Sequence, residues 1–138
     1  MTWGERIVAR ARGCVGARFR PQGRDPATGL DCVGVAVMAF GLPVMRVRKD
    51  YGLRGGSRTQ VEREMSDYFD RISPAKAGAG DLLLVEPGPE QLHMIILTPG
   101  GYLHADARLR RVVEVPGAAP WPVLGAWRYP DDPERRSH

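Results

Sequence analysis

An uncharged run from Cys32 to Phe40 constrains the fold of this chain more than any other stretch of the sequence. Turn-forming residues precede the run, and Gly41 and Pro43 end it. The pattern predicts a loop that leads into a short buried helix. Asp31 suits the N-cap of that helix, because its carboxylate can accept a hydrogen bond from a free backbone N–H. Cys32 is then the first helical residue.

A cysteine at the start of a helix is a candidate nucleophile. The free N–H groups and the helix dipole stabilise a thiolate there, so we expect the pKa of Cys32 to be lowered. Asp31 works against the thiolate, which makes a histidine the natural second cation. Gly34 is expected to leave the first turn open to a substrate backbone. The alternative is that Cys32 is a small buried core residue among valines.

Length and composition indicate one domain with one core, because the chain has 138 residues and is 43% hydrophobic. We expect the domain to span residues 1–130 and residues 131–138 to form a polar tail. The net charge of +4 favours a polyanionic partner, which includes nucleic acid, an anionic membrane surface or cell wall. The arginines are dispersed and no nucleic-acid motif is present, so we expect no nucleic-acid partner. The sequence shows neither a signal peptide nor a long apolar run, so we expect synthesis in the cytoplasm and no membrane anchor.

The first half of the chain predicts helices. Thr2 and Glu5 have capping-box spacing, and the amphipathic helix that follows places Cys14 on its apolar side as a core residue. Residues 16–29 and 45–56 are expected to be loops. Residues 57–72 predict another helix, capped by Thr59 with Glu62. Its apolar stripe consists of Val61, Met65, Phe69 and Ile72.

The second half of the chain predicts strands. Short β-type runs separated by Pro and Gly occupy residues 81–85, 93–97, 102–105, 111–115 and 123–129. Helices followed by a strand meander indicate an α+β fold, with an antiparallel sheet packed on the helices.

Two histidines belong to neighbouring predicted strands. If Pro99 and Gly100 form the centre of the turn between them, His93 and His104 project from the same face as diagonal neighbours. A turn centred on Thr98 and Pro99 would place them directly opposite each other. A turn centred on one residue would place them on opposite faces.

The simplest use of these residues is nucleophilic catalysis. Cys32 is then the nucleophile and His93 its general base, while His104 holds the His93 ring in the productive tautomer. Asp106 can share the orienting role. The alternative is a zinc site made of Cys32, His93, His104 and Asp106, but these ligands are scattered and include no close pair. We therefore expect no metal and no cofactor.

The ordered motifs resemble those of NlpC-type cell-wall cysteine peptidases. The resemblance runs from about Arg6 to Tyr129 and is carried by four segments, which are Gly29-Leu-Asp-Cys-Val-Gly-Val35, Gly80-Asp-Leu-Leu83, His93-Met-Ile-Ile96 and His104-Ala105. It implies a papain-like α+β fold with the nucleophile at a helix N-terminus. It also implies hydrolysis of peptide bonds in bacterial peptidoglycan, with Cys32, His93 and His104 as the catalytic residues.

The sequence departs from that family at two positions. Val33 stands where many members have Ser, and Phe19 stands where the family usually has a Tyr whose hydroxyl reaches the site. The Cys32 backbone N–H then remains as the donor to an oxyanion.

The short, Arg-rich chain also resembles the peptidases encoded with the tails of phages and gene transfer agents. That resemblance implies incorporation in a phage-like tail, tail or baseplate proteins as partners, and action in the periplasm or cell wall. Two alternatives stay open. One is a papain-like amidase or acyltransferase for a small molecule or lipid, and the other is a catalytically inactive structural component of the tail.

Overall fold

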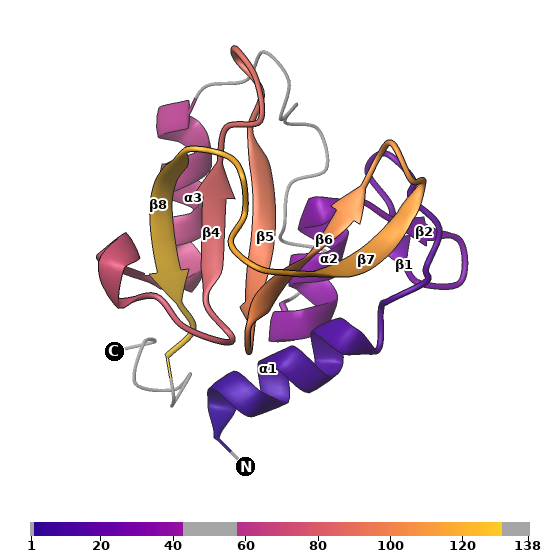
Figure 1. The fold of residues 1–138 in the computed structure, drawn as a ribbon, viewed down its shortest axis with the longest axis horizontal. Helices are drawn as coiled ribbons and strands as arrows, with labels where there is room; N and C mark the ends of the chain where they lie inside the picture. Colours follow the sequence, from indigo (N-terminus) through magenta and orange to yellow (C-terminus); the bar gives the residue numbers. More distant parts are fainter. Residues whose placement is uncertain (1, 43–57, 131–138) are drawn as a thin grey trace.

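The computed structural model of the chain describes residues 2–42 and 58–130. Its centre is an antiparallel sheet whose strands lie in the order β3-β8-β4-β5-β6-β7 (Figure 1). The strands β4 to β7 form a meander, and β8 returns to pair with β4 on its other side. These strands are β3 (Asp70–Ile72), β4 (Leu82–Val85), β5 (His93–Thr98), β6 (Gly101–Asp106), β7 (Arg111–Pro116) and β8 (Val123–Arg128). The predicted α+β class and the five predicted strands are confirmed.

The first two predicted helices are also confirmed. Helix α1 (Trp3–Arg12) begins where the Glu5 N–H donates to the Thr2 hydroxyl at 3.1 Å. Helix α2 (Cys32–Phe40) is buried along almost its whole length and packs on α1, β5 and β6. Cys14 is 3% exposed within the core, as predicted. None of the helices in the described ranges is long and apolar enough to cross a membrane.

The predicted helix over residues 57–72 is too long. Helix α3 (Arg58–Tyr68) stops four residues earlier, and the chain continues into β3. Thr59, the expected cap, lies inside the helix. Ile72 pairs with Ala126 of β8 and packs against the sheet face opposite to the one that Met65 contacts. Pairing with β3 satisfies the backbone N–H and C=O groups along the edge of β8, which a longer α3 would leave without these partners. Tertiary structure therefore overrides the helical period of the sequence.

The segment expected to be an irregular loop, residues 16–29, is partly ordered by β pairing. Strands β1 (Arg24–Asp25) and β2 (Gly29–Leu30) form a small hairpin that packs on α2. A short 3₁₀ helix, η1 (Pro74–Lys76), follows β3. The loop predicted at residues 45–56 and the tail predicted at 131–138 lie outside the described residues.

The turn between β5 and β6 has the register that brings the two histidines to one face. Thr98 pairs with Gly101 and Ile96 with Leu103, so Pro99 and Gly100 are the two central residues. Gly100 has φ of +76°, which a side chain would disfavour in such a tight turn. His93 and His104 lie beyond the last of these pairs, where β6 curves away from β5 (Figure 1).

The sheet separates two hydrophobic clusters. The larger cluster lies between the sheet and the helices and includes the fully buried Trp127. The smaller cluster, on the other face, contains Ile95 and Tyr102 and is covered partly by Trp121. Residues two apart on a strand share a face, so His104 stands beside Tyr102 on the smaller cluster's side.

Candidate active site

A pocket of about 720 Å³ opens where the start of α2 meets the diverging ends of β5 and β6. Its lining includes six of the seven predicted site residues, which are Phe19, Asp31, Cys32, His93, His104 and Asp106. Residues from the N-terminal loop, a helix start and two strands are thus brought to one place.

The start of α2 is fixed by Asp31, which caps the helix as predicted. Its Oδ1 accepts the Gly34 N–H at 2.8 Å and also pairs with the Arg24 guanidinium at 2.8 Å. Its Oδ2 accepts the Gln22 N–H at 2.8 Å. Because one carboxylate binds both the helix and the preceding loop, the position of Cys32 is set by groups on each side of it.

The thiol of Cys32 is protonated at rest, contrary to the expected lowered pKa. Burial and, after it, the negative charge of Asp31 raise the pKa of Cys32 to about 12. The Met94 N–H, the Arg24 charge and the Val33 N–H act in the opposite direction but do not outweigh these two causes. Cys32 is only 5% exposed, so the helix terminus does not compensate for the loss of water around a thiolate.

The two histidines are in direct contact. His93 Nε2 lies 2.8 Å from His104 Nδ1, which is a hydrogen-bond distance. Burial, followed by the neighbouring His104, lowers the pKa of His93 to about 4, although Asp106 acts to raise it. Burial also lowers the pKa of His104, again against Asp106. Both rings are therefore neutral near pH 7.

Asp106 carries a negative charge on the far side of His104. Its Oδ1 accepts the N–H groups of Arg108 at 2.8 Å and Leu109 at 3.0 Å, and its Oδ2 lies 3.8 Å from His104 Nε2. Burial acts to raise the pKa of Asp106, but these N–H groups and the nearby charges outweigh it and lower the pKa.

The order of these groups selects one tautomer for each ring. An ionised Asp106 favours a proton on His104 Nε2, which leaves His104 Nδ1 as an acceptor. His93 must then donate from Nε2 and keep the lone pair on Nδ1. This is the ring nitrogen that can take a proton from a thiol in the pocket.

Trp121 is a pocket residue that the sequence prediction missed. Its ring lies 5.8 Å from the His93 ring and 5.5 Å from the His104 ring, centroid to centroid. The indole helps to exclude water from the histidine pair, which accounts in part for their lowered pKa values. The only sequence signal is an aromatic residue between two prolines ahead of the last strand.

Gly34 has a different role from the predicted one. A Cβ added at Gly34 would lie 2.1 Å from the Gly23 carbonyl oxygen, and Gly34 is not among the residues that line the pocket. The glycine therefore permits the loop that contains Gly23 and leads into β1, here called the β1 loop, to pack closely on α2, and it does not open the helix to substrate. Phe19 does line the pocket, where it presents a ring without a hydroxyl.

The zinc alternative requires a cluster of ligands. Across residues 2–42 and 58–130, no group of three or more His, Cys, Asp or Glu side chains is arranged to hold a metal ion.

An α+β fold with a cysteine at a buried helix start and a histidine pair on the adjoining sheet defines a papain-like domain. No protein-family model matches the sequence, and a search of curated proteins gives no match either. Solved structures do match. The chain is 30% identical to the NlpC/P60 domain of the peptidoglycan hydrolase SagA, over 82% of this chain and 88% of that one, with a TM-score of 0.54. The chain belongs to the NlpC/P60 family.

Two further structures share the fold at lower identity. NlpC2 from Trichomonas vaginalis is 18% identical with a TM-score of 0.68, over 93% of this chain and 47% of that one. The peptidoglycan hydrolase RipB from Mycobacterium tuberculosis is 22% identical with a TM-score of 0.60, over 91% of this chain and 64% of that one. This chain thus spans less than half of the NlpC2 chain.

Proposed function

We propose that this protein is a cysteine endopeptidase that hydrolyses peptide bonds of bacterial peptidoglycan. The observation that carries the proposal is the contact of His93 with His104, which in turn lies beside Asp106, in the pocket that Cys32 lines. That order leaves a free lone pair on His93 Nδ1 in the same pocket as the protonated thiol of Cys32. The SagA and RipB domains, which share the fold, are both peptidoglycan hydrolases by name.

The reaction begins with both partners neutral. As the Cys32 sulfur attacks the carbonyl carbon of the scissile bond, its proton passes to His93 Nδ1. The carbonyl oxygen becomes an oxyanion, which the Cys32 backbone N–H at the helix start stabilises. The next two N–H groups of the helix have other partners. The Gly34 N–H donates to Asp31, and the Val33 N–H acts on the Cys32 sulfur. Phe19 supplies no hydroxyl to the oxyanion.

The intermediate collapses when His93 returns the proton to the leaving amine. The C–N bond breaks and a thioester to Cys32 remains. Water then attacks the thioester and gives its proton to His93, and the sulfur leaves with that proton as a thiol. Through both half-reactions, His104 accepts the His93 Nε2–H and keeps the ring oriented, while Asp106 stabilises the charge on the imidazolium.

Digestion of purified peptidoglycan tests this function. The wild-type protein and Cys14→Ala are expected to release new amino groups, and Cys32→Ala is expected to release none. Activity should be lost to iodoacetamide and survive a chelator. If the protein cleaves small-molecule amides or lipids and releases no amino groups from peptidoglycan, the amidase or acyltransferase alternative would be favoured. No release from any of these substrates would favour an inactive structural protein.

We also propose that the protein reaches the wall as a component of a phage-like tail. The support is the resemblance of this short, Arg-rich sequence to tail-associated peptidases, and residues 45–56 and 131–138 are the proposed docking segments. Mass spectrometry of purified particles should find the protein at a fixed copy number per tail. Recovery from the soluble lysate alone would overturn this route of delivery.

A further inference from the structure

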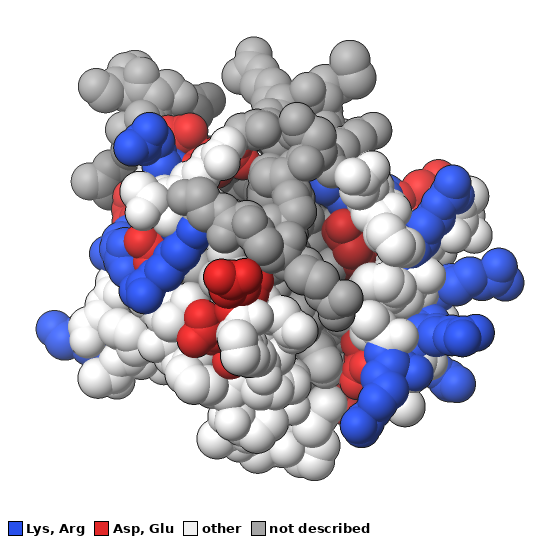
Figure 2. Space-filling view, turned by 90° about the horizontal axis from the view of Figure 1, so that it is seen from above, with Lys and Arg blue, Asp and Glu red and all other residues white. Residues whose placement is uncertain are grey.

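Five exposed arginines lie on two segments that each contribute a residue to the lining of the active-site pocket. They come from two segments, the N-terminal loop and the β6–β7 turn with the start of β7. The arginine rim consists of Arg18, Arg20, Arg108, Arg110 and Arg111. In the space-filling view, basic side chains gather along the edge of the molecule where β1, β2 and the β6–β7 turn lie (Figure 2).

The backbone beneath the rim is well held. Arg18 bridges to Arg111, and the Phe19 N–H donates to the Arg110 carbonyl at 2.9 Å. Within the turn, Asp106 accepts the Arg108 N–H. The two segments are therefore joined to each other through their backbones, which keeps the five arginines on one part of the surface.

The rim arginines differ from other arginines in their partners. Arg24 pairs with Asp31 at 2.8 Å, and Arg12 pairs with Glu114 at 3.0 Å. Among the residues that the structure describes, no ion pair joins a rim arginine to a carboxylate, although Arg108 and Asp106 interact electrostatically. Exposed positive charges on two joined segments, without an ion pair of their own there, attract a polyanion that comes from outside the chain.

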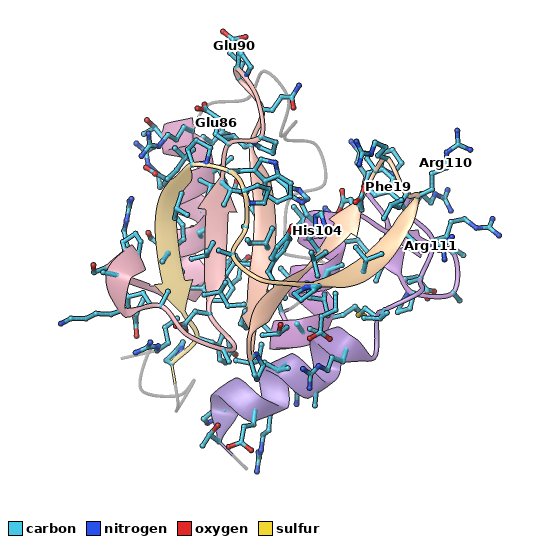
Figure 3. The ribbon with its side chains drawn as sticks, viewed as in Figure 1. Phe19, Glu86, Glu90, His104, Arg110 and Arg111 are labelled. Atoms are coloured by element: carbon cyan, nitrogen blue, oxygen red, sulfur yellow. The ribbon has the colours of Figure 1, made fainter. Side chains whose placement is uncertain are left out.

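The rim is continuous with the pocket. Arg108 lines the pocket itself, and Phe19, between Arg18 and Arg20 in the sequence, lines it too. Arg110 and Arg111 extend outward from the β6–β7 end, with Phe19 between them and His104 in the view of Figure 3. A polymer whose scissile bond lies at Cys32 can therefore continue from the pocket over the rim.

We propose that the arginine rim binds carboxylates of the peptidoglycan strand outside the scissile peptide, and so holds the polymer on the enzyme. This inference rests on the proposed function, because it assumes a wall polymer in the pocket. Peptide stems with free carboxylates offer repeated anions along one strand, and a guanidinium binds a carboxylate with two parallel hydrogen bonds. Single-stranded nucleic acid fits less well, since bases need exposed aromatic rings to stack on, and in the described ranges 2–42 and 58–130 the aromatic residue within the rim segments is the half-buried Phe19.

A sedimentation assay tests the proposed role of the rim. It measures how much of the catalytically inactive Cys32→Ala protein is retained on purified peptidoglycan. Arg18→Gln, Arg110→Gln and Arg111→Gln are added together to that protein. The matched control adds Arg6→Gln, Arg63→Gln and Lys76→Gln, which remove three exposed positive charges away from the pocket. We expect the rim variant to bind about tenfold more weakly and the control to bind nearly as before. Retention of the unmodified Cys32→Ala protein should fall as NaCl rises.

The chemistry of the wall decides what the rim recognises. Converting the wall carboxylates to neutral amides should abolish the difference between the rim variant and its control. If that difference persists after amidation and vanishes once phosphodiester polymers are removed, the carboxylate proposal is overturned. Equal weakening by rim and control variants would overturn it as well. If binding depends on the rim but the wild-type protein does not hydrolyse peptidoglycan, only the proposed function is refuted. If the wild-type protein hydrolyses peptidoglycan but binding does not depend on the rim, only the proposed role of the rim is refuted.

Discussion

Burial sets the protonation states of the two residues that are proposed to exchange a proton. It raises the pKa of Cys32 to about 12 and lowers the pKa of His93 to about 4. Each shift disfavours the charged form, as expected for groups removed from water. The resting site therefore holds a thiol and a neutral imidazole, and charge develops only when a substrate is attacked.

Alkylation kinetics test the resting state of the thiol. The rate of Cys32 alkylation by iodoacetamide should rise about tenfold per pH unit between pH 7 and 9, because the thiolate fraction does so below the pKa. Peptide mapping separates Cys32 from Cys14, whose pKa is also raised by burial. A Cys32 rate that is already high and level near pH 7 would show a thiolate at rest.

Substitution of the histidines tests their separate roles. His93→Ala should lower kcat/KM by about 10²–10⁴-fold, as expected for loss of a general base. His104→Ala should cost about 10–100-fold, because it removes an orienting partner. His104→Gln should recover part of that loss, since its amide oxygen can accept the His93 Nε2–H. If glutamine were no better than alanine, the assigned tautomer would be wrong.

At the scale of the elements, the start of α2 depends on how closely the β1 loop packs against it. The Gly23 carbonyl lies where a side chain on Gly34 would have to go. The ion pair of Arg24 with Asp31 also joins this part of the chain to the start of α2.

Gly34→Ala is therefore expected to lower the free energy of unfolding by about 1–3 kcal/mol, because the added methyl group forces the loop away from the helix. It should also reduce activity by shifting Cys32. Gly78→Ala is a suitable control, since a Cβ there meets nothing within 4 Å. Denaturant unfolding measures both variants, and equal stability of the two would show that the close approach does not constrain the site.

Elements with strong local signals could be predicted from the sequence. The Thr2 cap, the uncharged run after Asp31 and the two-residue turn at Pro99 and Gly100 each fix structure within a few residues. The end of α3 could not be predicted, because Ile72 continues the helical period and leaves it only to pair with β8.

The candidate site was predictable to the same extent. The hairpin register was enough to place His93 and His104 on one face, and the ordered motifs shared with NlpC-type peptidases joined Cys32 to them. The approach of Trp121 to the histidines and of Gly23 to Gly34 depends on loop packing between distant segments. The burial that sets the pKa of Cys32 depends on tertiary structure in the same way, so the sequence argument from the helix dipole gave the wrong direction.

At the scale of the whole molecule, the buried histidine links the site to folding. The unfolded chain takes up a proton on His93 near pH 6.5, whereas the folded protein resists it until about pH 4. The unfolded state therefore binds more protons between these values, so stability rises with pH across this window.

The free energy of unfolding should accordingly fall by roughly 3 kcal/mol from pH 7 to pH 4 through His93 alone. His104, whose pKa is also lowered, contributes in the same direction. Denaturant unfolding at several pH values measures the slope. His93→Gln should flatten it, and an unchanged slope in that variant would place the titration elsewhere.

The most direct test of the catalytic site is to trap the acyl intermediate. Peptidoglycan fragments are mixed with the protein, the reaction is quenched in acid within milliseconds to seconds, and the intact protein and its peptides are weighed by mass spectrometry. A thioester on Cys32, absent from Cys14 and from the Cys32→Ala protein, is the predicted result. Hydrolysis that continues in Cys32→Ala, or an adduct carried by Cys14, would contradict the assignment of Cys32 as the nucleophile.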